Sequence, residues 1–200
     1  MSDRILGLLA LVMASLVVGL ALFWNPLPAV QPSAYPVLPR GGDFTLQSAD
    51  GPVSLRDFRG KVVLVFFGYT FCPDICPTAL VAVADAMEQL KPKEKRDVAV
   101  LFVSVDPERD TPQGLKQYTA FFHPNIIGVT GSAEQVRKVA QDYGAIYARQ
   151  PGVSAGGGYV VDHSADIYVV SGDGRVVDKI SHGATSARIA TSIRNAMRFS

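Results

Sequence analysis

The sequence has only two cysteines and no long run of basic residues. With no further cysteine in the chain, a structural zinc site made of four cysteine ligands is excluded. The formal net charge is +1, and the longest basic cluster, residues 91–96, is interrupted by Glu94. Such a cluster is typical of a solvated loop, so nothing in the charge pattern indicates a nucleic-acid partner.

The N-terminal part of the chain lacks charge altogether over residues 5–24. A helix of this length rises ~30 Å, enough to cross the hydrocarbon of a bilayer, and Trp24 stands where an interfacial aromatic residue is expected. A cleaved signal peptide is the alternative, but no A-x-A-like cleavage site is found at Ala29 or Ala34. We therefore predict an uncleaved transmembrane anchor.

The orientation of this anchor follows from Arg4, the one basic residue before it. The positive-inside rule places residues 1–4 in the cytoplasm and the C-terminal domain outside it. Because no transit peptide rich in Arg and Ser precedes the segment, we expect a single-pass protein of a bacterial inner membrane, with its domain in the periplasm. Residues 25–40 include five prolines and predict a semi-stiff tether, followed by one domain over residues 41–200.

The rest of the chain alternates between strand and helix patterns. Continuous apolar runs at residues 61–67 and 98–105 predict strands buried on both faces, with a helix at 78–90 between them. The other expected elements are a hairpin around Asp50-Gly51, a helix at 112–122, a strand at 126–129, a helix capped at Ser132 and ended by Gly144, a mobile glycine-rich loop at 147–159, a hairpin over 167–180 and a closing helix at 185–197. This order fits an α/β, thioredoxin-like fold with a mixed central sheet, an extra N-terminal hairpin and inserted elements.

Both cysteines, Cys72 and Cys76, fall between a buried strand and a helix, where sites form in open α/β sheets. If the first turn is helical through Cys76, the two Cα atoms are ~6 Å apart on one face, within reach of a disulfide or of a single ion. A purely structural disulfide would close a very short loop and add little stability. Two readings therefore stay open: a metal site whose oxidised form is the disulfide, and a thiol-disulfide exchange pair.

A metal site needs further ligands, and the chain has three histidines. His163 follows the glycine-rich segment at a strand edge, whereas His123 is interpreted as structural and His182 as a surface residue. Two thiolates and an imidazole form a soft set that selects Cu(I) or zinc. Zinc with an open position would suit hydrolysis, but no general base is indicated beside the site except Asp74 or Asp162. Copper held by few ligands fits a carrier better.

Three sequence blocks resemble the SCO/SenC family of copper-binding assembly factors of cytochrome c oxidase. They are "FFGYTFCPDICPTAL" at residues 66–80, "VSVDPERDTP" at 103–112 and "YVVDHSADIYVV" at 159–170, in the expected order. The resemblance covers roughly residues 40–200 and implies a thioredoxin-like domain that binds one copper ion through Cys72, Cys76 and His163. One departure is the turn at 171–174, where a proline-containing turn is expected.

The resemblance also implies a function. It predicts a metallochaperone that exchanges copper with other carriers and delivers it, as Cu(I) and also Cu(II), to the binuclear copper site of oxidase subunit II. The alternative is a membrane-tethered reductase that uses Cys72 and Cys76, but not His163, to reduce the cysteines of that site or of another client; a peroxidase is a lesser rival.

Several further residues carry expectations about the site. We expect Asp162 to orient the ring of His163, and the glycines at 156–158 to let that ring swing away during transfer. Asp110 is interpreted as part of a helix cap, whereas Glu108 and Arg109 are left over and are expected to form a docking surface for a partner.

Overall fold

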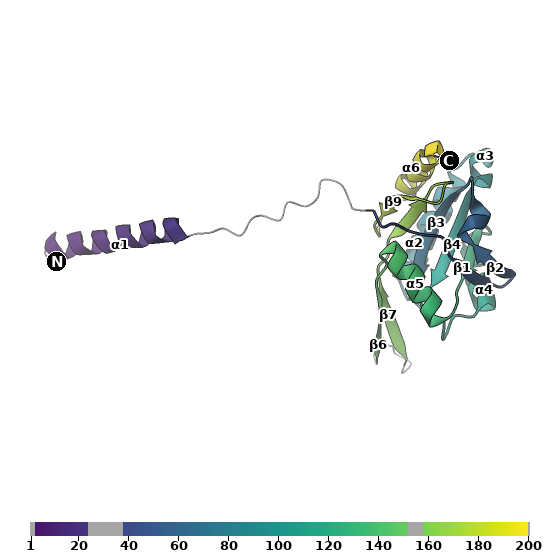
Figure 1. Ribbon diagram of the computed structural model, residues 1–200, viewed down its shortest axis with the longest axis horizontal. Coiled ribbons are helices and arrows are strands. Elements are labelled where there is room, and N and C mark those ends of the chain that lie inside the picture. Colours follow the sequence, from purple (N-terminus) through teal and green to yellow (C-terminus); the bar gives the residue numbers. More distant parts are fainter. Residues whose placement is uncertain (1–2, 24–37, 152–157, 200) are drawn as a thin grey trace. The chain divides into compact units, whose positions relative to one another are not determined.

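The structure is a computed structural model that describes residues 3–23, 38–151 and 158–199. It divides into two units, Met1–Val37 and Leu38–Ser200 (Figure 1). In the first unit, α1 spans Asp3–Phe23. Among the described residues, no helix combines the length and the apolar character that crossing a membrane requires. The transmembrane anchor predicted at residues 5–24 is therefore not supported by the structure.

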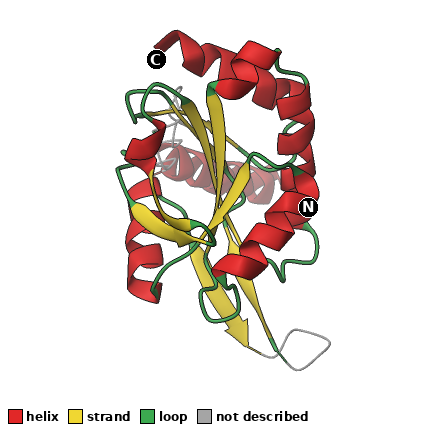
Figure 2. Ribbon diagram, turned by 90° about the vertical axis from the view of Figure 1, so that its right-hand side faces the viewer, coloured by secondary structure: helices red, strands yellow, loops and turns green. Residues whose placement is uncertain are grey.

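The second unit is built around a mixed five-stranded sheet with strand order β5-β4-β3-β8-β9 (Figure 2). The central strand β3 (Val62–Gly68) pairs in parallel with β4 (Val98–Ser104) and antiparallel with β8 (Ile167–Val170). On the outside, β5 (Ile126–Val129) continues the parallel half and β9 (Val176–Ile180) the antiparallel half. Every residue of β3 and β4 is buried, as expected for apolar strands covered on both faces. The predicted mixed central sheet is confirmed.

Helices cover both faces of this sheet (Figure 2). They are α2 (Ile75–Glu88), α4 (Pro112–Phe122), α5 (Ala133–Tyr143) and α6 (Ser186–Ala196), with short 3-10 turns at Leu55–Phe58 and Met197–Phe199. The predicted capping box at Ser132 and the left-handed Gly144 that ends α5 are confirmed. The basic cluster at 91–96 is not a loop: α3 (Pro92–Arg96) forms there, because Pro92 suits a first helical turn and the Glu94 carboxylate accepts from the Lys91 amide.

Two hairpins lie outside the central sheet. The first pairs β1 (Thr45–Ser48) with β2 (Gly51–Ser54), as predicted. The second pairs β6 (Tyr147–Pro151) with β7 (Tyr159–His163), where the sequence predicts a mobile loop. That prediction is wrong for β6 and for Tyr159, the first residue of β7. The two strands pair across the glycines because the β-formers Tyr147 and Tyr159–Val161 favour an extended chain on either side of them. Residues 152–157, with most of the glycines expected to move, lie outside the described residues.

Asp110 ties the loop that carries the cysteines to the sheet. Its side chain is not the cap of α4: Thr111 accepts the Gly114 amide instead. Asp110 is buried, and its carboxylate accepts hydrogen bonds from the amide and hydroxyl of Thr70 (3.0 and 2.5 Å) and from the hydroxyl of Ser104 (2.6 Å). Because Thr70 follows β3 and Ser104 ends β4, one carboxylate fixes the start of the cysteine loop against the carboxyl edge of the sheet.

Candidate metal centre

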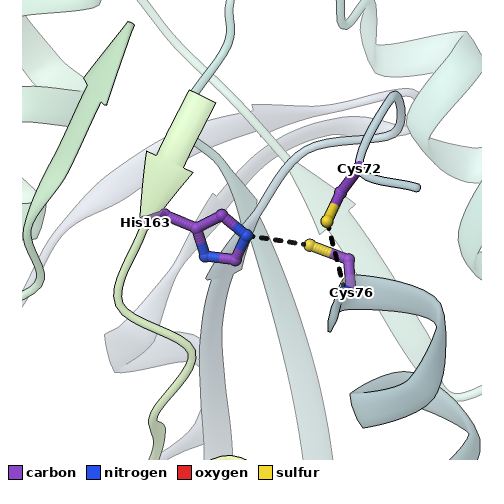
Figure 3. A group of neighbouring side chains, drawn as sticks. All are labelled: Cys72, Cys76 and His163. Carbon is purple, nitrogen blue, oxygen red and sulfur yellow. Dashed lines mark hydrogen bonds between the residues drawn. The ribbon is translucent and has the colours of Figure 1, made fainter. Parts of the chain in front are cut away.

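Cys72, Cys76 and His163 meet at one point of the fold (Figure 3). Cys72 lies in the loop after β3, Cys76 in the first turn of α2, and His163 at the last position of β7. Their ligand atoms all lie within 4.8 Å of one another, and this is the one group of its kind that could hold a metal among the described residues. Cys76 is 0% exposed and Cys72 is 9% exposed, so an ion or a partner would reach the sulfur of Cys72 first.

The two cysteines converge by a geometry that differs from the predicted one. The helix begins at Ile75, so Cys72 lies outside it rather than one turn below Cys76 on a common face. Pro73 explains the difference, because a residue before proline is driven away from the helical conformation. Instead, the sulfur of Cys72 folds back and accepts the amide N–H of Cys76 at 3.4 Å. Asp74, at the cap position, makes no side-chain capping bond.

Hydrogen bonds between the two cysteines set the charge on their sulfurs. The hydrogen bond from the Cys76 thiol holds the pKa of Cys72 well below that of an ordinary thiol, although burial acts in the opposite direction, and the backbone amides of Cys76 and Asp74 lower it further. The hydrogen bond between the two thiols, and burial, raise the pKa of Cys76. The reduced pair therefore carries a thiolate on Cys72 and a proton on Cys76. The positive end of α2 favours this arrangement.

A backbone carbonyl orients the ring of His163. Nδ1 lies 3.1 Å from the carbonyl oxygen of Ser164 and donates its N–H there, which leaves the lone pair on Nε2. Nε2 points at the sulfur of Cys76, 3.3 Å away. The ring sits edge-on between Tyr69 and Phe66, with centroid distances of 5.8 and 6.3 Å. The neutral imidazole is thus aimed at the cysteine pair.

Asp162 does not orient this ring, so that expectation is wrong. Successive side chains of a strand point to opposite faces, and Asp162 on β7 points away from His163. Its carboxylate accepts from the side-chain amide of Gln150 at 2.9 Å. Asp74 is exposed at the start of α2, and its carbonyl accepts from the hydroxyl of Thr78.

The two other histidines lie outside the cluster, as predicted. His123 is buried: its Nδ1 accepts from the amide of Asn125 and its Nε2 contacts Glu88 at 3.2 Å, so it joins the ends of two helices. His182 is exposed after β9.

Gly68 is a site residue that sequence reasoning missed. A Cβ at this position would lie 2.6 Å from the sulfur of Cys76 and 2.8 Å from the ring of Phe102. Any side chain would therefore displace the sulfur or the core ring. The available signal was a glycine ending the buried run of β3, four residues before the first cysteine, because strand glycines often mark a close approach.

These residues can do two kinds of chemistry. A thiolate, a second sulfur that can lose its proton and a neutral imidazole nitrogen form the donor set that soft ions such as Cu(I) or zinc prefer, and the buried surroundings limit competition from water. The same two free cysteines can act as a dithiol, with Cys72 as the attacking sulfur.

The charge assignment predicts different reactivities for the two thiols. In the reduced protein without metal, Cys72 should still react with iodoacetamide as the pH falls from about 8 to about 5, because its lowered pKa keeps it a thiolate; Cys76, with a raised pKa, should stay protonated and unlabelled. Fragment mass spectra of the peptide that carries both cysteines would locate the label. In urea, where the protein is unfolded, the two cysteines should lose reactivity over the same pH range. Preferential labelling of Cys76 in the folded protein would contradict the assignment.

The contact at Gly68 predicts a mutational effect specific to the site. Gly68→Ala should displace the sulfur of Cys76, weaken its bond to Cys72 and reduce the labelling of Cys72 in acid, while overpacking lowers the unfolding free energy by about 1–3 kcal/mol. Gly128→Ala is the matched control: Gly128 lies in β5, on another part of the sheet, and its Cβ would lie 2.7 Å from Leu115 of α4. It should lose comparable stability in urea and keep the labelling pattern. Identical labelling in both variants would refute the role of Gly68.

Known proteins resemble this chain in fold and in sequence over most of its length. The family described as SCO1/SenC matches residues 34–198. Protein SCO2 homolog, mitochondrial, of Bos taurus is 41% identical over 158 residues, which make up 78% of this chain and 59% of that protein. The chain thus matches less than two thirds of the length of this curated relative.

Solved structures agree. Apo Sco1 of Thermus thermophilus is 43% identical with a TM-score of 0.71, covering 80% of this chain and 92% of that one. Arabidopsis thaliana ScoI with copper bound is 35% identical with a TM-score of 0.73, covering 80% and 99%. BsSco, described as a member of the Sco family of cytochrome c oxidase assembly proteins with a disulfide switch, is 29% identical with a TM-score of 0.66, covering 83% and 98%. From the extent of these matches and the shared fold, the chain belongs to the SCO1/SenC family.

Proposed function

We propose that this protein is a copper carrier in the assembly of cytochrome c oxidase and that it holds one Cu(I) ion through Cys72, Cys76 and His163. The observation that carries the proposal is the convergence of two sulfurs and an oriented imidazole nitrogen within 4.8 Å. The copper bound to the Arabidopsis relative and the description of BsSco as an oxidase assembly protein support it. We propose subunit II of the oxidase, with its binuclear copper site, as the recipient, and other copper carriers as donors.

Each ligand has a distinct part in loading. Cys72 is already a thiolate and is the more exposed sulfur, so it meets the ion first. Cys76 must give up its proton to bind, so loading releases a proton and affinity should fall in acid. His163 offers the lone pair of Nε2, because its Nδ1 donates to the carbonyl of Ser164. When bound, the soft ion can be passed on by exchanging these ligands for the thiolates of a recipient.

Reduction of a client disulfide is the second candidate function, and the asymmetric dithiol favours it. The Cys72 thiolate would attack one sulfur of the client disulfide and release the other as a thiolate, forming a mixed disulfide. Cys76, after losing its proton, would attack the sulfur of Cys72 and release the client's remaining thiolate. The client would then be reduced, and this chain would hold a Cys72–Cys76 disulfide. His163 has no part in these steps.

Titration with Cu(I) separates the two functions. The unit Leu38–Ser200, reduced and free of oxygen, is titrated against a chromophoric chelator. We expect one Cu(I) per chain and a loss of more than about tenfold in affinity for His163→Ala, which is ~1.4 kcal/mol of binding free energy. His182→Ala is the control and should bind as wild type does. Equal affinity of wild type and His163→Ala would refute the three-ligand site and leave the reductase as the better account.

We further propose that residues 5–24 tether the protein to a bacterial inner membrane, with Leu38–Ser200 in the periplasm. This part rests on the sequence, which has twenty consecutive residues without charge. After cell fractionation, the full chain should resist extraction from membranes by alkaline carbonate, and protease added to spheroplasts should digest the domain. A chain lacking residues 5–24 should be extracted. Recovery of the full chain in the soluble fraction would contradict the tether.

A further inference from the structure

The histidine of the centre is carried by a strand pair that is not part of the central sheet. β6 and β7 form a separate two-stranded sheet, whereas both cysteines follow the central strand β3. The distance between His163 Nε2 and Cys76 Sγ therefore depends on contacts that join the β6–β7 hairpin to the rest of the domain. Metal ligands tolerate errors of only about 0.2 Å, so these contacts matter for binding.

Arg109 makes contacts on both sides, beside the hydrogen bond from the Val161 amide to the Tyr69 hydroxyl. Its guanidinium donates from Nη1 to the carbonyl of Tyr159 at 2.9 Å and lies over the Tyr159 ring at 3.7 Å, at the start of β7. The same group lies over the ring of Phe71, next to Cys72, at 4.8 Å, and over that of Tyr69 at 5.6 Å. One side chain thus touches the cysteine loop and the histidine hairpin.

The base of this contact is rigid. Arg109 Nε is ion-paired with the carboxylate of Asp106, which is 1% exposed. The other oxygen of Asp106 accepts from the Tyr159 hydroxyl at 2.7 Å, and the Asp106 amide donates to the Ser104 hydroxyl at 3.1 Å. Because Ser104 ends β4, the arginine is held on the central sheet and holds the hairpin in turn.

The expected docking surface at Glu108 and Arg109 is therefore wrong for Arg109. Its side chain is only 22% exposed and is aimed inward, whereas Glu108 points outward and pairs with Arg149 at 2.8 Å. Nη2 of Arg109 is buried without a hydrogen-bond partner among the described residues. A buried donor without a partner lowers the stability of the fold. A residue kept at this cost fits a role at the site better than a role in stability alone.

We propose that Arg109 is a positioning residue of the metal centre: its guanidinium holds β7 against the cysteine loop and so fixes Nε2 of His163 beside the sulfur of Cys76. The role in metal binding rests on the function proposed above, but the role in placing His163 does not. Among the contacts of the described residues, Arg109 touches none of the three ligand side chains. It acts through Tyr159 and Phe71.

The first test uses the reduced protein without metal. The nitrogen NMR signals of the His163 ring and the hydrogen exchange of the Val161 amide, which donates to the Tyr69 hydroxyl at 3.3 Å, report the placement of β7. Arg109→Met should shift or broaden the ring signals and speed the exchange at least about tenfold. Arg149→Met, which removes the other cation over the Tyr159 ring at 4.0 Å, is the matched control and should change neither. Unchanged His163 signals in folded Arg109→Met would overturn the proposal.

The second test is a double-mutant cycle in Cu(I) affinity. Arg109→Met should weaken binding about tenfold in the wild-type background and little in the His163→Ala background, because its effect passes through that ring. Equal losses in both backgrounds would overturn the proposal. Arg109→Lys keeps a charge for Asp106 but not the planar stack or the second donor, so it should restore stability in urea without restoring affinity. It replaces Arg109→Met in both tests if that variant does not fold. Wild-type affinity of His163→Ala would refute the copper site alone, since the NMR test decides the claim about placement.

Discussion

The hydrogen bond from the Cys76 amide to the sulfur of Cys72 is the interaction on which the centre depends. The first turn of a helix leaves amides without partners, and an oxygen side chain usually accepts one of them. Here Asp74 stands at the cap position without capping, and a sulfur takes over. This contact brings the two cysteines together. The hydrogen bond from the Cys76 thiol then places negative charge on Cys72 at the positive end of α2 and keeps the proton on Cys76. The local fold of this loop and the chemistry of the cysteine pair are therefore linked.

Around this contact, three parts of the chain contribute to the site in different ways. The central sheet supplies a fixed edge, where Gly68 leaves room for a sulfur and the Asp110 carboxylate holds the start of the loop. The helix supplies an amide and a dipole. The β6–β7 hairpin supplies the imidazole, and Arg109 joins it to the edge of the sheet at Asp106 and to the cysteine loop at Phe71. A carrier needs ligands that are arranged in advance yet able to part, and a histidine on a separate strand pair meets both needs.

Much of this was readable from the sequence. The buried strands β3 and β4, the cap at Ser132 and the mixed sheet follow from apolar runs and a capping residue. The two cysteines and His163 stand out because the chain has so few alternatives. The contacts between distant segments were not readable. Local patterns made Asp110 a cap and Arg109 a surface residue, because the partners that bury them lie far away in the sequence, at Thr70 and Tyr159. The β6–β7 hairpin is hard to predict because its glycines outweigh its short arms. A helical spacing of Cys72 and Cys76 fails because Pro73 drives Cys72 away from the helical conformation.

The central proposal is that two sulfurs and one imidazole nitrogen of this chain bind the same copper ion. X-ray absorption at the copper edge of the Cu(I)-loaded protein tests it most directly. We predict two sulfur ligands at roughly 2.3 Å and one nitrogen at roughly 2.0–2.1 Å, the distances that these donors keep to zinc, with the nitrogen and its imidazole scattering lost in His163→Ala. A two-coordinate spectrum with sulfur alone, the same in wild type and variant, would contradict it.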